Sequence, residues 1–138
     1  MRSRTSFLDA GNVRLLLDTA TLIYAVETPE RLSKRASAAL RNPANILELS
    51  SVSITEIAIK ASLGKLKVTA PIVRQAVQDL DIRTLPYTAE HAFRLFEIPL
   101  HHSDPFDRQI IAQALSEKIA VVTPDEKFRL YSGLRIIW

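Results

Sequence analysis

The chain of 138 residues contains no cysteine. Disulfide bonds, thiolate metal sites and thiol nucleophiles are therefore excluded, and the lack of disulfides is compatible with a reducing cytoplasm. No apolar run approaches the roughly 20 residues that a membrane-spanning helix needs. Residues 1–12 also lack the apolar core of a secretory signal. We therefore expect a cytoplasmic protein that does not engage a membrane.

Aromatic residues are scarce, at 7% of the chain. We expect four of the five phenylalanines at core positions, namely Phe93, Phe96, Phe106 and Phe128. Tyr24 is expected in the core or in a protein interface. No surface for stacking nucleic-acid bases is therefore predicted, and target-sequence specificity cannot be inferred.

The composition is that of one globular domain. Apolar residues make up 47% and charged residues 24% of the chain, which is enough for a single hydrophobic core. The net charge of +3 is compatible with a polyanionic partner but is weak evidence alone. We place the domain at 13–138 and interpret 1–12 as a native extension or a remnant of cloning.

Hydrophobic periodicity predicts strands that alternate with helices. Short apolar runs indicate strands at 13–17, 46–50, 82–85, 119–123 and 134–138. Helices are expected at 18–26, 30–41, 53–63, 70–80, 88–98 and 104–118, with a short helix or turn at 125–131. This alternation predicts a three-layer α/β domain with a central, mostly parallel sheet of about four to five strands flanked by helices.

Local signals mark two of the helix starts. Ser53 is a good N-cap with Glu56 three residues later, which is the capping-box pattern. Asp104 followed by Pro105 is an N-cap carboxylate with proline at the first helical position. Gly64 is expected to end the helix that begins at Ser53.

Four acids are placed where they can meet. Asp18 and Asp125 follow predicted strands, and ligands of open α/β sheets bind at the carboxyl ends of strands. Glu56 and Asp107 are expected in first helical turns. If those helices begin at the same edge of the sheet, all four carboxylates converge there.

Four carboxylates in one small space require a cation, because like charges raise one another's pKa until some protonate. Ligands that are all oxygen favour Mg²⁺ or Mn²⁺ over zinc. Such a cation can polarise a phosphate and lower the pKa of a bound water, which is the chemistry of phosphodiester hydrolysis. The pattern therefore indicates a metal-dependent nuclease.

Each acid has a simpler interpretation when it is taken alone. Asp18 can be an N-cap, and Glu56 can be the capping-box partner of Ser53. Asp107 can interact with the helix dipole, and Asp125 can be a turn residue after a proline. These separate interpretations do not explain why all four acids occur in matching motifs.

Four segments carry a resemblance to a known family. They read LLLDT at 15–19, SITEIAIKASLGKL at 53–66, DPFDRQIIAQA at 104–114 and VTPD at 122–125. In order and spacing they resemble the PIN-domain nucleases, and most of all the VapC toxins of bacterial toxin–antitoxin modules. The resemblance covers nearly all of 13–138. Two features depart from it: Thr55 stands where tryptophan is common, and the segment before Val13 is longer than usual.

The resemblance implies a parallel-sheet α/β fold and RNA cleavage that depends on one or two Mg²⁺ or Mn²⁺ ions. It implies that the catalytic and metal-binding acids are Asp18, Glu56, Asp107 and Asp125. Thr19 and Thr123 match hydroxyl positions that hold a carboxylate or a water on the metal. We expect Asp104 to be a cap, with support of a second metal as the alternative. The resemblance also implies a VapB-type antitoxin and a homodimer.

Basic side chains near these motifs are candidates for RNA phosphate contacts. Arg108 is the strongest, followed by Lys60 and Lys65. Lys60 can instead pair with Glu56 one turn away. We expect His101 and His102 to be solvent-exposed loop residues.

Two other functions compete with the nuclease. The first is a non-catalytic RNA-binding or antitoxin-binding module on the same fold, although binding alone does not need clustered carboxylates. The second is a phospho-accepting receiver-like domain. That class needs an acidic pair after the first strand, whereas this chain has one aspartate there.

Overall fold

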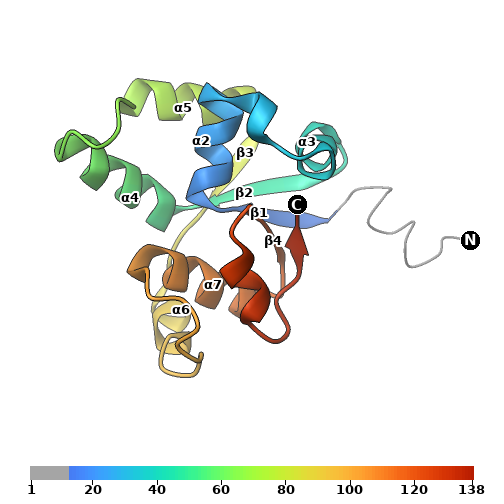
Figure 1. The fold of residues 1–138 in the computed structure, drawn as a ribbon, viewed down its shortest axis with the longest axis vertical. Coiled ribbons are helices and arrows are strands. Elements are labelled where there is room, and N and C mark those ends of the chain that lie inside the picture. The colour runs from blue at the N-terminus through green and yellow to red at the C-terminus, as the bar shows by residue number, and fades with distance from the viewer. Residues whose placement is uncertain (1–12) are drawn as a thin grey trace, which may run out of the picture.

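The computed structural model describes residues 13–138, in which the strands form one five-stranded, fully parallel sheet (Figure 1). The strand order is β3-β2-β1-β4-β5. The strands are β1 (Arg14–Leu17), β2 (Ile46–Ser50), β3 (Ile82–Leu85), β4 (Ala120–Val122) and β5 (Ile136–Ile137). The predicted α/β fold is confirmed. The predicted N-terminal extension, 1–12, lies outside the described residues.

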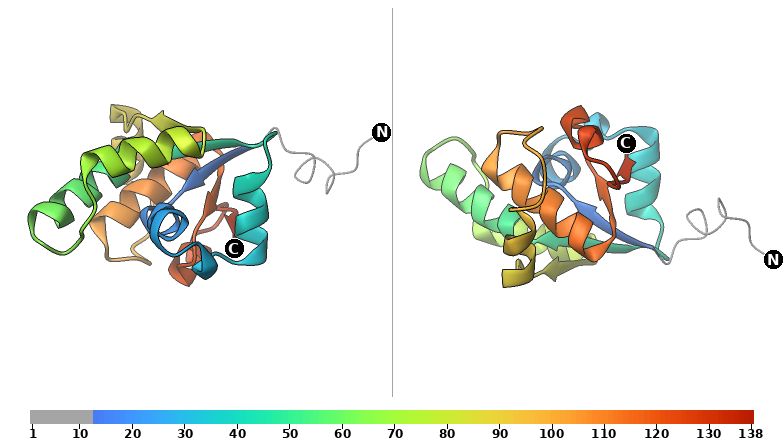
Figure 2. Two further views of the ribbon diagram at one scale, coloured as in Figure 1. Left: turned by 90° about the horizontal axis from the view of Figure 1, so that it is seen from above. Right: turned by 90° about the horizontal axis from the view of Figure 1, so that it is seen from below.

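Helices cover both faces of the sheet, as the views from above and below show (Figure 2). One face carries α2 (Thr19–Glu27), α3 (Lys34–Arg41) and α5 (Ala70–Asp79). The other carries α6 (Ala89–Arg94), α7 (Pro105–Glu117) and the 3₁₀ helix η2 (Glu126–Leu130). Helix α4 (Ser51–Ser62) leaves the sheet from the end of β2 and contributes to both cores. A 3₁₀ turn, η1 (Pro29–Arg31), follows α2.

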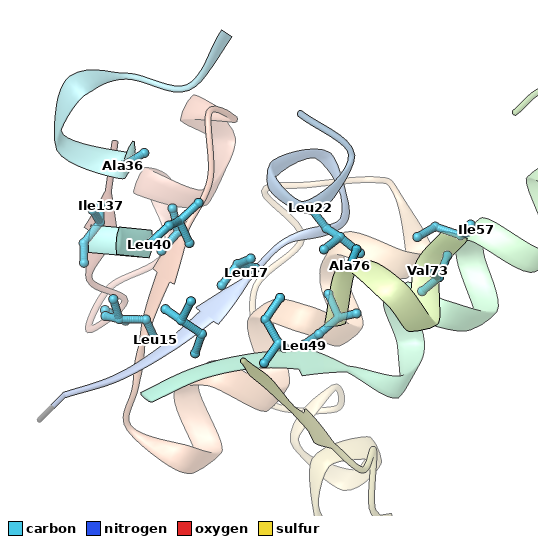
Figure 3. Packing of buried hydrophobic residues seen from close by; sticks show 14 of the residues in the cluster. Leu15, Leu17, Leu22, Ala36, Leu40, Leu49, Ile57, Val73, Ala76 and Ile137 are labelled. Atoms are coloured by element: carbon cyan, nitrogen blue, oxygen red, sulfur yellow. The ribbon is translucent and has the colours of Figure 1, made fainter. Parts of the chain in front are cut away.

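A hydrophobic core lies on each face of the sheet, because successive side chains of β1 point to opposite faces. Leu15 and Leu17 pack against the α2, α3 and α5 layer (Figure 3), while Leu16 faces α7. All three leucines are buried. Burying one leucine side chain contributes about 2 kcal/mol. The central strand is therefore apolar on both faces because both faces are covered.

Three helix boundaries differ from the prediction. The segment 30–41 divides into η1 and α3, because the Ser33 hydroxyl accepts the Ala36 N–H and starts a new helix. Helix α4 begins at Ser51 with Ser50 as its N-cap, so the predicted capping box of Ser53 with Glu56 is wrong. The segment 88–98 forms only the short helix α6. The helix stop at Gly64 agrees with its positive φ of 72°.

Two of the predicted core phenylalanines are on the surface. Phe93 is 62% and Phe96 is 86% exposed, and their rings stack at 6.3 Å. Helix α6 is too short to bury a full apolar face, and the side chain that it does bury is His91. Phe128 is buried as predicted, and Phe106 is partly buried. Tyr24 packs partly buried against Trp138.

The order in which the chain adds strands to the sheet reverses between β1 and β4, although the strands stay parallel. From β1 it proceeds outward through β2 to β3, then returns to β4 on the other side of β1. Ligands of such sheets bind at this switch point, outside the carboxyl ends of the strands. The Asp18 N–H donates to the Val122 carbonyl at 3.1 Å, so the ends of β1 and β4 lie side by side there.

None of the helices in residues 13–138 is long and apolar enough to cross a membrane.

Candidate active site

Asp18 stands at the switch point, directly after β1. It is 3% exposed and is the N-cap of α2. Its Oδ1 accepts the Thr21 N–H at 2.8 Å, and its Oδ2 accepts the Thr123 hydroxyl at 2.6 Å. The capping role and the predicted support by Thr123 therefore coexist in one carboxylate.

Asp125 is held beside Asp18 by the same threonine. The Thr123 hydroxyl oxygen accepts the Asp125 N–H at 3.0 Å. Asp125 caps η2 by accepting the Lys127 N–H at 2.9 Å. Its carboxylate lies close enough to Asp18 to act on the titration of that group.

Asp107 reaches the same edge from the first turn of α7. Asp104 is the N-cap, and its Oδ1 accepts the N–H groups of Phe106 at 2.8 Å and Asp107 at 3.1 Å. Asp104 is thus a cap, as expected, and Asp107 occupies the third helical position. The cap sets the direction from which the Asp107 side chain enters the site.

Glu56 enters from α4, in the second turn of the helix and not in the first as predicted. It is 5% exposed. Its Oε2 accepts a hydrogen bond from the Lys60 ammonium at 2.5 Å, which is the i,i+4 pair that the sequence allowed. Its Oε1 is buried without a hydrogen-bond partner. A buried carboxylate oxygen left in this state is costly unless a cation or donor meets it.

His102, which was expected on the surface, lies between two of these carboxylates, those of Asp107 and Asp125. His102 is 6% exposed, whereas His101 is exposed as expected. The His102 Nε2 lies 2.7 Å from Asp125 Oδ2 and 3.1 Å from Asp107 Oδ2. The three side chains offer ligand atoms within 4.8 Å of one another. The prediction that His102 is a solvent-exposed loop residue is therefore wrong.

A local signal for this burial was present in the sequence. His102 lies two residues before the cap Asp104, and at that spacing its ring folds back so that Nδ1 accepts the Asp104 N–H at 3.2 Å. A side chain that bonds the backbone of a helix cap is held at the start of the helix, where Asp107 also is. The short-range pattern could have indicated the contact with the cap, but not the contact with Asp125.

Burial and neighbouring charges raise the pKa of two of the carboxylates, Asp18 and Asp107. Burial raises the pKa of Asp18 to about 6, opposed by the hydrogen bonds from Thr123 and Thr21 and reinforced by the charge of Asp125. Burial also raises the pKa of Asp107 to about 7, reinforced by the charges of Asp104, Asp18 and Glu56 and opposed by His102. The site therefore holds more negative charge than its own residues neutralise.

The residues present suit a hard divalent cation. Apart from the His102 imidazole, the donors at this edge are carboxylate oxygens, and one of these oxygens, Glu56 Oε1, is buried and unpartnered. Burial and then the neighbouring negative charges raise the pKa of Asp107, and added positive charge would favour its ionised form. Oxygen donors of this kind favour Mg²⁺ or Mn²⁺.

Other predicted residues take different places. The Thr19 hydroxyl donates to the Ser53 hydroxyl at 2.9 Å, so it ties α2 to α4 and not to a carboxylate; its alternative role toward a water on the metal stays a prediction. Arg108 donates to the Pro99 carbonyl at 3.0 Å and lies 3.4 Å from the Tyr131 hydroxyl. Lys65 is exposed beyond the end of α4.

Comparisons with known proteins show the family and the fold of the chain. The family model for the PIN domain matches residues 15–134, nearly the whole described chain. Among curated protein sequences, none matches this chain.

Solved structures share the fold. A VapBC2 complex from Rickettsia felis bound to a promoter DNA fragment contains a chain that is 19% identical, with a TM-score of 0.63 over 90% of this chain and 97% of that one. A DNA-bound VapBC from Salmonella typhimurium gives 20% identity and a TM-score of 0.63 over 90% and 96%. VapBC-5 from Mycobacterium tuberculosis, a toxin–antitoxin system, gives 21% and 0.58 over 91% and 98%.

Proposed function

The chain belongs to the PIN domain family, and from that premise we propose that it is a metal-dependent endoribonuclease, the VapC-type toxin of a toxin–antitoxin module. One observation carries the proposal. Carboxylates from four separate elements lie near enough to one another at the switch point of the sheet to interact electrostatically, and one of their buried oxygens has no partner. A binding module on this fold has no need of that costly arrangement.

The proposed catalytic and metal-binding residues are the predicted quartet: Asp18, Glu56, Asp107 and Asp125. A bound Mg²⁺ or Mn²⁺ would polarise the scissile phosphate and lower the pKa of the attacking water. The protein's own part is to fix the carboxylates: Thr123 and Thr21 orient Asp18, and the Asp104 cap orients Asp107.

Lys60 is the proposed contact for the RNA backbone nearest the site. Its ammonium pairs with Glu56, and its pKa is raised by that hydrogen bond and by the charges of Asp104 and Asp107. The ammonium therefore stays charged at the edge of the cluster, within reach of a bound phosphate. Lys65 and Arg108 are the more distant candidates, and all three would supply salt-dependent affinity.

The proposed partner is a VapB-type antitoxin, because the similar structures are VapBC complexes. A homodimer in the cytoplasm is part of the same proposal. The test is to co-express the chain with the product of a small neighbouring gene. We expect a stable complex in which RNA cleavage is inhibited. A neighbour that binds without inhibiting cleavage would contradict the antitoxin assignment.

The central experiment incubates the purified chain with total cellular RNA and Mg²⁺ or Mn²⁺. We expect discrete cleavage products that disappear with EDTA and in the Asp18→Asn variant. Asp81→Asn is the matched control, since Asp81 is exposed and its positive φ of 53° suits asparagine. Cleavage that survives Asp18→Asn would point to a contaminating nuclease, and metal binding without cleavage of any RNA class would contradict the proposed activity.

A further inference from the structure

His102 joins two carboxylates that come from different elements. Its Nε2 is 2.7 Å from Asp125, at the start of η2, and 3.1 Å from Asp107, in the first turn of α7. The two aspartates are 18 positions apart in the sequence, so no local pattern holds them together. The imidazole is the group that bridges them directly.

The other ring nitrogen determines what Nε2 can do. Nδ1 accepts the Asp104 N–H at 3.2 Å, so Nδ1 carries the lone pair and the ring proton is on Nε2. Nε2–H is therefore a donor, and the carboxylates of Asp125 and Asp107 are its acceptors. In this orientation the ring does not offer a lone pair to a cation at the site.

The ring is fixed by the core. The His102 N–H donates to the Tyr131 hydroxyl at 2.9 Å, and the ring stands edge-on to Phe128 at 5.8 Å between centroids. Phe128 and Tyr131 are 0% and 2% exposed. Moving the imidazole would disturb both, so the donor is pre-organised before any ligand arrives.

We propose that His102 is a positioning residue: its Nε2–H holds Asp107 and Asp125 together in the orientation in which they bind the divalent cation. This inference rests on the proposed metal-dependent function. Donors behind the ligands of a metal site orient those ligands, and their loss weakens metal binding by about 10–100-fold. His102 would do so for two ligands at once.

The first test measures the affinity for Mn²⁺ by electron paramagnetic resonance titration. We expect His102→Ala to bind Mn²⁺ about 10–100-fold more weakly. His102→Gln should recover most of the affinity, because its amide N–H can donate to the same carboxylates. His101→Ala is the matched control: it removes the adjacent exposed imidazole and should leave the affinity unchanged. A glutamine variant no better than alanine would overturn the donor role.

A double-mutant cycle separates positioning from a merely structural effect. If His102 acts through Asp125, His102→Ala should cost much less affinity in an Asp125→Asn background than in the wild type. An equal loss in both backgrounds would overturn the proposal, as would an unchanged affinity in the single variant. Pulsed measurements on bound Mn²⁺ should find no directly coordinated ¹⁴N, and strong coupling to an imidazole nitrogen would make His102 a ligand instead.

The outcomes distinguish this inference from the proposed function. RNA cleavage together with a His102→Ala affinity equal to wild type would overturn the His102 role alone. If His102→Ala weakens Mn²⁺ binding and the loss depends on Asp125, but the wild-type chain cleaves no RNA, the ribonuclease proposal alone is overturned. A wild-type chain that takes up no Mn²⁺ would overturn both.

Discussion

Two groups of buried or half-buried acids lie at opposite ends of the strands, and they differ in the charges that surround them. At the carboxyl ends, the acid edge consists of Asp18, Glu56, Asp107 and Asp125. Near the amino ends, on the α7 face, the paired network consists of Arg14, Glu48, His91 and Glu117.

Each carboxylate of the paired network has a basic side chain of the same network as a hydrogen-bond partner on both of its oxygens. The Arg14 guanidinium bonds both oxygens of Glu48, at 2.5 and 3.0 Å, and reaches Glu117 at 3.1 Å. His91 Nε2 lies 2.8 Å from the other oxygen of Glu117. These hydrogen bonds, first from His91 and then from Arg14, hold the pKa of Glu117 below its usual value.

The contrast shows that burial alone does not mark the candidate site. Glu48 is 1% exposed, which is less than Asp18 at 3% or Glu56 at 5%. Yet Glu48 has a bidentate arginine, while the acid edge has raised pKa values and an unpartnered oxygen. Missing counter-charge is therefore the feature that points to a ligand.

The largest expected effect is on RNA cleavage, which should depend on the acid edge and not on the paired network. Asp107→Asn is expected to lower RNA cleavage by at least about 100-fold. Removing a carboxylate that binds the metal should cost more activity than removing a residue that only orients such a carboxylate. Glu48→Gln should leave the rate per folded molecule unchanged. Initial rates on a cleaved RNA, with the folded fraction measured in parallel, check this. Equal losses in both variants would remove the functional distinction between the two groups.

The stability of the fold should depend on the paired network, in contrast to RNA cleavage. Glu48→Gln is expected to lower the free energy of unfolding by about 2–3 kcal/mol, since it leaves Arg14 without its bidentate partner. Urea unfolding in EDTA measures this. The double variant Arg14→Leu with Glu48→Leu should lose less than Glu48→Gln does, because it leaves no unpaired charge. A larger loss in the double variant would mean that the ion pair itself stabilises the fold.

Metal-free stability should reveal the repulsion at the acid edge. The folded-state pKa of Asp107 is raised to about 7, so the folded chain binds this proton more tightly than the unfolded chain does. This contribution to stability is present at low pH and is lost as pH rises from about 4 to about 7. Asp107→Asn should therefore raise the free energy of unfolding at neutral pH, in EDTA, by on the order of 1–3 kcal/mol.

The check on that result is a pH series of urea unfolding for the wild type and for Asp107→Asn, with saturating Mg²⁺ as a second condition. The advantage of the variant should fall at acid pH and reverse in Mg²⁺. A variant that is less stable than the wild type at every pH in EDTA would show that Asp107 is not repelled in the folded chain.

The smallest expected effect is the loss of stability in Glu117→Gln. Its pH dependence should be opposite to that of Asp107→Asn. Glu117 has a lowered pKa, so its contribution is present above its ordinary value and is lost as pH falls through the folded-state pKa. Glu117→Gln should cost about 1 kcal/mol at neutral pH, because the carboxylate is partly exposed. The cost should disappear in acid. Thermal unfolding at two pH values measures it, and a cost that grows in acid would contradict the assignment.

The order of elements was readable from the sequence, because each signal is local. The apolar runs at β1, β2 and β4 and the cap at Asp104 depend on residues within a few positions of one another. The exposure of Phe93 and Phe96 was not readable. An apolar spacing on a short segment does not say whether another element is there to cover it.

Some residues of the candidate site could likewise be predicted from the sequence, and others could not. The four acids and Thr123 were found from their motifs, since strand ends and helix starts in a parallel sheet meet at one edge. The capping box of Ser53 and the surface position of His102 were wrong. The capping box failed for a local reason, because Ser50 caps the helix three residues earlier. The position of His102 was decided by a partner distant in the sequence, Asp125.

The sequence by itself therefore determined the parallel α/β fold and the family, and it predicted which four acids form the site. Only the tertiary structure decided which acids have partners on both oxygens: Glu48 meets Arg14 from the neighbouring strand, while Glu56 pairs with Lys60 through one oxygen and keeps the other without a partner. The physical reason is the range of the interactions. Periodicity and caps act over one or two turns, whereas charge balance in a buried site depends on side chains that the fold brings together from distant segments.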